Sequence, residues 1–174
     1  MAYFLMVKTI RSSRRGQRVQ DYRREFADEM EKIKRGVKAN FEAVTADWKN
    51  KPTFVARKYI TGEGFRITCS PRKNKAGQIF HYVNKGTPPH VIRPKRAKAL
   101  RFRLGYKPRT FPGPARIRVS GGGGKATGKV VFAKIVHHPG TKAREFDKAI
   151  MAYWKPEFRR RMNNTFRRIA RRSK

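Results

Sequence analysis

A long helical stripe of apolar side chains is the feature that most constrains the fold of this chain. From residue 22 to residue 48, successive apolar residues are three or four positions apart: Tyr22, Phe26, Met30, Ile33, Val37, Phe41, Val44 and Trp48. This spacing places all of them on one face of an α-helix, so it predicts a single helix over about residues 20–50. Asp21 suits the cap or first turn of this helix, and Pro52 lies just past its end.

A second stripe predicts a C-terminal helix within residues 142–174. Its apolar residues again step by four or three: Phe146, Ile150, Trp154, Phe158, Met162, Phe166 and Ile169. Pro156 lies inside the stripe and lacks the N–H that an interior helical position needs, so we expect it to kink or restart the helix. From residue 155 onward there are nine basic residues and one acid, Glu157. The final helix is therefore both amphipathic and strongly basic.

Strand-like sequence fills residues 53–138. The segment FVARKYITGEGFRITC (54–69) predicts two strands around a Thr-Gly-Glu-Gly turn. Alternation of Leu100, Phe102 and Leu104 with arginines predicts a strand with one buried face and one basic, exposed face. Further strands are expected at residues 78–86, 98–106, 115–120 and 129–137.

Two segments depart from this pattern of helices and strands. Residues 1–19 start with the apolar AYFLMV, which is too short for a membrane span and reads as a buried strand or packing arm, and continue as a flexible basic arm. Residues 105–129 are rich in Pro and Gly and carry no acid. We expect this excursion from the sheet to be either a functional loop or a disordered one. The whole chain, 1–174, is predicted to be a single α+β domain in which the long N-terminal helix packs on a mainly antiparallel sheet.

The charge of the chain points to a polyanionic partner or to acidic neighbouring subunits. Lys and Arg number 45 against 11 acids, a formal net charge of +34. Seven of the acids lie between residues 20 and 48, so the first helix is nearly neutral and the rest of the chain is the polycation. The single cysteine, Cys69, cannot form an internal disulfide, which suits a reducing compartment such as cytoplasm.

Motifs for catalysis or cofactor binding are weak, and we predict no enzyme activity, no cofactor and no metal. GGGGKAT (121–127) lacks the Ser or Thr and the first Gly of a phosphate loop, so a flexible hairpin tip is favoured. The four histidines (His81, His90, His137 and His138) have few acids to join them in a metal or nuclease site. Structural or interface roles are favoured for them.

Two sequence patterns are compatible with binding to a partner, but are also explained by ordinary packing. A basic amphipathic helix also suits membrane surfaces or acidic grooves, although a core-packed helix with a solvated face is preferred. The aromatic residues among arginines in RFRLGYKPRTF could stack on single-stranded bases. Alternation in a half-buried strand explains the same pattern with fewer assumptions, and we prefer it.

The segments around HYVNKGTPPHVIRPKRAKALRF (81–102) and VFAKIVHHPGTKAREF (131–146) resemble the neck or tail-completion family of tailed bacteriophages, often described as minor tail or virion morphogenesis proteins. In that family a strand ends in Tyr-Val-x-x-Gly-Thr, followed by Pro-His-x-Ile-x-Pro, Lys-Ala-Leu-x-Phe, and later His-Pro-Gly-Thr before a final helix. The matching residues are Tyr82, Val83, Gly86, Thr87, Pro89, His90, Ile92, Pro94, Lys98, Ala99, Leu100, Phe102, His138, Pro139, Gly140, Thr141 and Phe146. Many relatives have a Pro where this chain has Glu145.

These motif residues also have a physical interpretation as architecture. Gly86 and Gly140 allow backbone turns that side chains would obstruct, and the prolines stiffen the connections. Thr141 could cap the final helix, and Phe146 begins its apolar stripe. We therefore expect the His-Pro-Gly-Thr corner to fix how the last helix leaves the sheet.

The resemblance implies a structural virion protein made in the host cytoplasm and placed at the head–tail interface. It would form a ring of six or twelve copies between a connector or adaptor and the tail-terminator or tail-tube proteins, with double-stranded DNA passing through and no membrane involved. Basic residues would contact DNA or an acidic partner, and we expect these to be Arg11, Arg14, Arg15, Arg18, Arg109, Arg116, Arg118 and Lys125. The alternatives are a monomeric nucleic-acid-binding protein without sequence preference and, less favoured, a nuclease.

Overall fold

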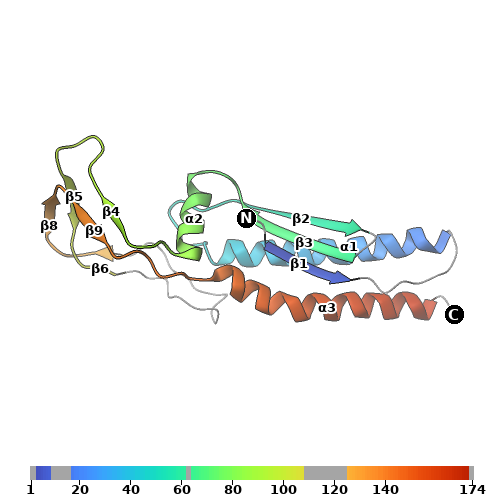
Figure 1. Cartoon of the computed structure of the whole chain (residues 1–174). Helices are drawn as coiled ribbons and strands as arrows, with labels where there is room; N and C mark the ends of the chain where they lie inside the picture. The colour runs from blue at the N-terminus through green and yellow to red at the C-terminus, as the bar shows by residue number, and fades with distance from the viewer. Residues whose placement is uncertain (1–2, 9–16, 62–63, 108–124, 173–174) are drawn as a thin grey trace.

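Two long helices lie side by side next to a small antiparallel sheet, and an arm of paired strands extends from one end of this body (Figure 1). The computed structural model describes residues 3–8, 17–61, 64–107 and 125–172, and the side chains within these ranges except those of residues 3–8, 17–21, 106–107 and 125. This arrangement confirms the predicted α+β class, with helices near both ends of the chain and antiparallel strand pairing.

The first helix, α1, spans Gln17–Ala43. Its stripe from Met30 to Phe41 is fully buried, as the three- and four-residue spacing predicts. The helix ends seven residues before the predicted boundary at residue 50. Over residues 45–48, backbone N–H groups donate three residues back, in tight turns, and the Thr45 hydroxyl donates to the carbonyls of Phe41 and Glu42 (3.3 and 3.2 Å). Asp21 is the fifth residue of α1, so the prediction that it lies at the cap or in the first turn is wrong.

The sheet contains strands β1 (Tyr3–Lys8), β2 (Phe54–Thr61) and β3 (Gly64–Pro71) in the order β1-β3-β2. Thr61 pairs with Gly64, so β2 and β3 form the hairpin predicted around the Thr-Gly-Glu-Gly turn, of which residues 62–63 lie outside the described ranges. The apolar N-terminal segment is a strand, as expected, and pairs antiparallel with β3. Because β3 is central, Ile67 and Cys69 are buried (1% and 0% exposed).

Helix α2 (Lys75–Lys85) replaces the strand that was predicted at residues 78–86. Asn74 caps it, since its Oδ1 accepts from the Gly77 N–H at 2.9 Å. Phe80 is fully buried while Tyr82 is 59% exposed, although both would point to the same face of a strand. The prediction was wrong because Ile79, Phe80 and Val83 suit either period, and the cap at Asn74 decides for the helix.

The last helix, α3, spans Phe146–Arg172, so it begins four residues after the predicted start and runs through Pro156 without a restart. Phe146 begins its buried stripe as expected, but near the C-terminus the stripe passes through Thr165 (2% exposed) rather than Phe166 (41% exposed). Thr141 lies five residues before the helix and does not cap it. The residue that does so is Asn84 of α2, whose Oδ1 accepts from the Asp147 N–H at 3.2 Å.

In the described part of the arm, six short strands form three antiparallel pairs. The pairs are β4 (His90–Ile92) with β9 (Val136–His138), β5 (Leu100–Arg103) with β8 (Val130–Ala133), and β6 (Tyr106–Lys107) with β7 (Lys125–Ala126). Leu100 and Phe102 are half-buried and the arginines between them exposed, as alternation predicts, but Leu104 is 50% exposed. The predicted strand 115–120 lies outside the described residues.

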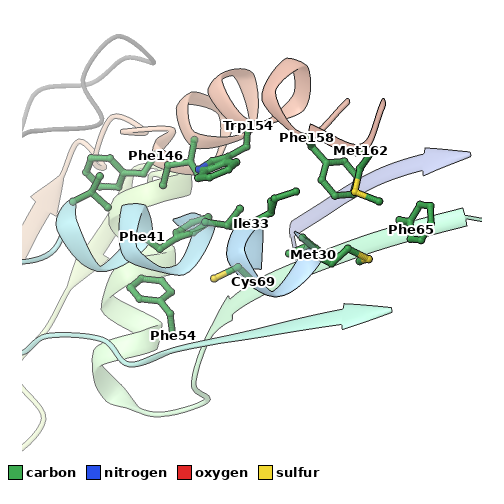
Figure 2. Packing of buried hydrophobic residues seen from close by; sticks show 14 of the residues in the cluster. Met30, Ile33, Phe41, Phe54, Phe65, Cys69, Phe146, Trp154, Phe158 and Met162 are labelled. Atoms are coloured by element: carbon green, nitrogen blue, oxygen red, sulfur yellow. The ribbon is translucent and has the colours of Figure 1, made fainter. Parts of the chain in front are cut away.

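One core cluster joins the helices and the three-stranded sheet (Figure 2). At one end the rings of Phe41, Phe54, Phe80 and Phe146 meet, with centroids 5.0 Å apart for Phe54 and Phe80. Trp154, Phe158 and Met162 of α3 continue the cluster along α1. The body is thus a single packed unit, and it holds the base of the arm through α2 and α3.

Candidate interaction surfaces

The two motif segments that are far apart in the sequence meet at the base of the arm. Thr87 and Thr141 form an antiparallel bridge with backbone bonds of 3.0 and 3.1 Å, and the Thr141 N–H also donates to the Thr87 hydroxyl. Gly140 (φ 87°) and Gly86 (φ 75°) lie beside this bridge in positive-φ conformations. A Cβ at Gly140 would lie 2.3 Å from the Thr87 carbonyl oxygen. Both glycines are therefore required by the close backbone approach, as predicted.

The corner also ties the end of α2 to the start of α3. The N–H groups of Arg144 and Glu145 donate to the carbonyls of Val83 and Asn84, both at 3.0 Å. Together with the cap from the Asn84 side chain, these bonds fix the direction in which α3 leaves the arm. Asn84 is fully buried, and sequence analysis missed it because its helix was taken for a strand.

Glu145 has a φ of 53°, a value that proline cannot adopt because its ring fixes φ near −65°. A chain with proline at this position, as in many members of the phage family that the sequence resembles, would therefore need a different backbone here. Lys148 forms an ion pair with the Glu145 carboxylate in the first turn of α3.

The histidines of the corner take part in backbone contacts. His90 and His138 are cross-strand partners whose ring centroids lie 4.9 Å apart. The Gly140 N–H donates to Nδ1 of His138 at 3.0 Å, and Nδ1 of His90 lies 2.9 Å from the Pro88 carbonyl. His137 faces solvent on the opposite face of β9. Within the described residues, no three His, Cys, Asp or Glu side chains come together in a way that could hold a metal ion.

The arm exposes large apolar side chains. Phe132 is 69% exposed, Leu104 50%, Val91 48% and Ile135 45%. Phe132 lies opposite Arg101 in the β5–β8 pair, so an aromatic ring and a guanidinium share one face of the arm. We call these exposed residues of the arm the arm face (Val91, Arg101, Leu104, Phe132 and Ile135); together they combine apolar area with positive charge.

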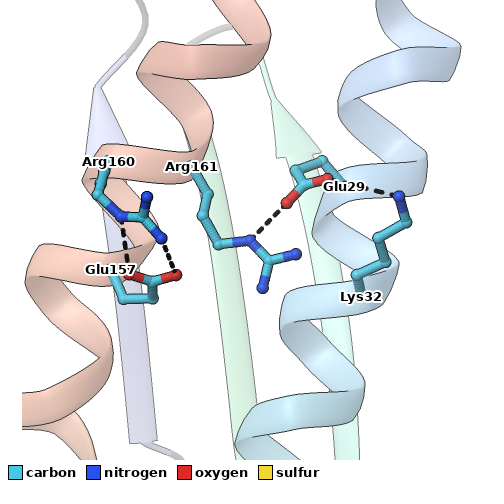
Figure 3. Close-up of polar contacts among 5 residues, drawn as sticks. All are labelled: Glu29, Lys32, Glu157, Arg160 and Arg161. Carbon is cyan, nitrogen blue, oxygen red and sulfur yellow. Dashed lines mark hydrogen bonds and ion pairs between the residues drawn. The ribbon is translucent and has the colours of Figure 1, made fainter.

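The acids of α1 do not simply neutralise their own helix, because two of them hold α3. Glu29 accepts from Arg161 at 2.5 Å and also pairs with Lys32 (Figure 3). Glu25 accepts from both Arg168 and Arg172, at 3.1 and 2.8 Å. Sequence analysis did not foresee these pairs, which join positions 132 to 147 residues apart.

The basic residues predicted to contact DNA or an acidic partner are only partly placed. Arg11, Arg14, Arg15, Arg109, Arg116 and Arg118 lie outside the described residues, and only the backbone is described for Arg18 in α1 and Lys125 in β7. The ends of β1 and α1 that flank residues 9–16 lie at the same end of the molecule as the C-terminus of α3 (Figure 1).

Cys69 is expected to be chemically inert in the native protein. Burial raises the pKa of its thiol to about 12, so the reactive thiolate is scarce at neutral pH. We predict that a thiol reagent at pH 8 labels native Cys69 at least about tenfold more slowly than the same chain in denaturant, a comparison that follows the released chromophore. Equal rates would show that the β3 core opens readily.

No protein-family model, curated protein or solved structure matches this chain. In the part of the chain that the structure describes, no helix is both long enough and apolar enough to cross a membrane.

Proposed function

We propose that this protein is a non-enzymatic structural component of the head-to-tail neck of a tailed bacteriophage, where copies of the chain join into a ring. The proposal rests on the sequence resemblance and on one structural observation, the uncovered arm face. Two-stranded pairs of two to four residues are marginally stable alone, and apolar side chains exposed to water favour burial against a partner. A neighbouring copy in a ring supplies that partner in a fixed position.

The division of the molecule into body and arm suits this role. The body has a continuous core, and the Thr87–Thr141 bridge together with the Asn84 cap fixes the arm to it. An arm held in this way carries a contact surface outward from the body (Figure 1). The neighbouring rings and the packaged DNA would then be the acidic partners of the net charge of +34.

A complementation assay tests the arm face. In a phage whose own copy of the gene is interrupted, the chain is supplied from a plasmid as wild type or with Val91→Asp and Phe132→Asp. We expect the double variant to restore no more infectious particles than an empty plasmid, because two carboxylates would be placed in the buried contact. Particle titre and electron microscopy of the lysates measure the result.

The matched control is Ile60→Asp with Tyr153→Asp, which places the same two charges at large side chains outside the arm and outside the motif segments that are 43% and 54% exposed. It should complement as the wild type does, and thermal unfolding should show both purified double variants folded. Full complementation by the arm variant would contradict the proposed contact through the arm face. A chain that binds nucleic acid tightly but never enters particles would instead favour the monomeric nucleic-acid-binding protein.

A further inference from the structure

The cations of α3 fall into two groups that differ in their partners. Nine Lys and Arg residues lie in this helix. Five of them form ion pairs with acids: Lys148, Arg160, Arg161, Arg168 and Arg172. The other four have no ion pair with any described residue: Lys155, Arg159, Arg167 and Arg171.

The four unpaired cations form an oblique row that winds across the exposed side of the helix, because each step of four residues turns about 40° around the axis. They are separated by four, eight and four positions, and Asn163 occupies the place between Arg159 and Arg167. Side chains four residues apart are neighbours on a helix surface, and all four are exposed. Over the 16 steps from Lys155 to Arg171 the helix rises about 24 Å. We call this row the α3 ridge (Lys155, Arg159, Arg167 and Arg171).

The acids nearest to the ridge are already engaged elsewhere. Glu157 accepts from Arg160 through both carboxylate oxygens, at 3.0 and 2.8 Å. Glu25 and Glu29 hold the cations on the α1 side of α3. Glu25 and Glu29 thus join α3 to α1, Glu157 pairs within α3, and none of the three neutralises a cation of the ridge.

We propose that the α3 ridge binds the phosphate backbone of duplex DNA. A duplex carries one negative charge per about 1.7 Å of its axis, so about 24 Å of it presents about 14 phosphates to four cations. No base needs to be read and no register needs to be kept, since phosphate contacts carry no sequence information. The ridge would therefore accept a duplex of any sequence that crosses the exposed side of α3 obliquely, in the direction of the row.

A membrane surface does not fit the same helix. Amphipathic helices bind lipid by burying their apolar face in the bilayer. In α3 that face is occupied, because Ile150, Phe158 and Met162 are 0–3% exposed in the core. The charge of the ridge is thus presented without the apolar area that lipid binding requires.

The test compares two variants of the full purified chain that lose the same charge. The ridge variant carries Lys155→Gln, Arg159→Gln, Arg167→Gln and Arg171→Gln. The control carries Lys49→Gln, Lys51→Gln, Lys73→Gln and Lys75→Gln, four exposed cations before β2 and at the start of α2 that form no ion pair with any described residue. Each has a net charge of 34 − 4 = +30. Binding to a duplex of random sequence is measured by fluorescence anisotropy over a range of salt concentrations.

Each lost phosphate contact lowers the slope of log affinity against log salt by about 0.9, so the ridge variant should lose about 3 to 4 units of slope and the control less than about 1. An equal loss in the two variants would overturn the proposal, because the charge would then act diffusely. Unchanged DNA binding by the ridge variant would also overturn it. The same holds if the ridge variant keeps its affinity for DNA and loses affinity only for anionic lipid vesicles, measured alongside. Thermal unfolding checks that both variants are folded.

The proposal for the α3 ridge and the proposed joining role can be refuted independently of each other. The ridge is measured on the isolated chain with DNA alone, whereas the joining role is measured by complementation with arm variants. A ridge variant that loses DNA binding while its particles still assemble would leave the neck proposal intact.

Discussion

Replacing Phe80 with alanine lowers the free energy of unfolding by about 3–5 kcal/mol. Phe80 is 0% exposed and its ring meets Phe41, Phe54, Trp48 and Phe146, so truncation leaves a cavity where α2 joins the sheet and α3. Neighbouring side chains from α1, the segment after it, β2 and α3 cannot all shift to fill it. Urea unfolding followed by tryptophan fluorescence measures the change.

Tyr82→Ala is the control for this experiment. It lies two residues further along α2, and its side chain is exposed, so its removal should change the free energy of unfolding by no more than about 0.5 kcal/mol. In a strand, residues 80 and 82 would share a face and both substitutions would act alike. Similar costs for the two variants would therefore contradict the helical structure of α2.

Gly140→Ala destabilises the base of the arm by at least about 2 kcal/mol. Alanine at a φ of 87° costs about 1–2 kcal/mol by itself. In addition, its Cβ would lie 2.3 Å from the Thr87 carbonyl oxygen, which would force apart the Thr87–Thr141 bridge. Thermal unfolding should show the loss, and hydrogen exchange should show faster exchange at the Thr87 and Thr141 amides.

Gly105→Ala separates the cost of a positive φ from the cost of the close backbone approach. Its φ of 72° is comparable, but the nearest atom to an added Cβ is the Gly128 nitrogen at 3.8 Å, an ordinary contact. It should therefore show the conformational cost alone and leave the exchange at Thr87 and Thr141 unchanged. If the two alanine variants were equally destabilised, the close approach at Gly140 would have no energetic role.

Sequence periodicity predicted those parts of the fold in which one face is buried over many residues. The stripes of α1 and α3 and the hairpin of β2 and β3 belong to this class. Errors arose where a short pattern suits two periods. Residues 78–86 were one such case, and in α3 the step after Met162 could be three or four, so Thr165 rather than Phe166 entered the core.

The candidate surfaces depended on long-range contacts that periodicity does not encode. The motif glycines were predicted as turn residues, but the pairing of Thr87 with Thr141 and of His90 with His138 follows from the path of the arm. Likewise, the acids between residues 20 and 48 seemed to balance one helix. Only the packing of α1 on α3 shows which cations of α3 they hold and which they leave unpaired.

The joining role is tested most directly by electron microscopy of lysates from a phage in which this gene carries an early stop codon. We predict separate heads and tails, or emptied heads, with joined particles restored when the wild-type chain is supplied from a plasmid. Intact, infectious particles in the uncomplemented lysate would contradict a role in the neck.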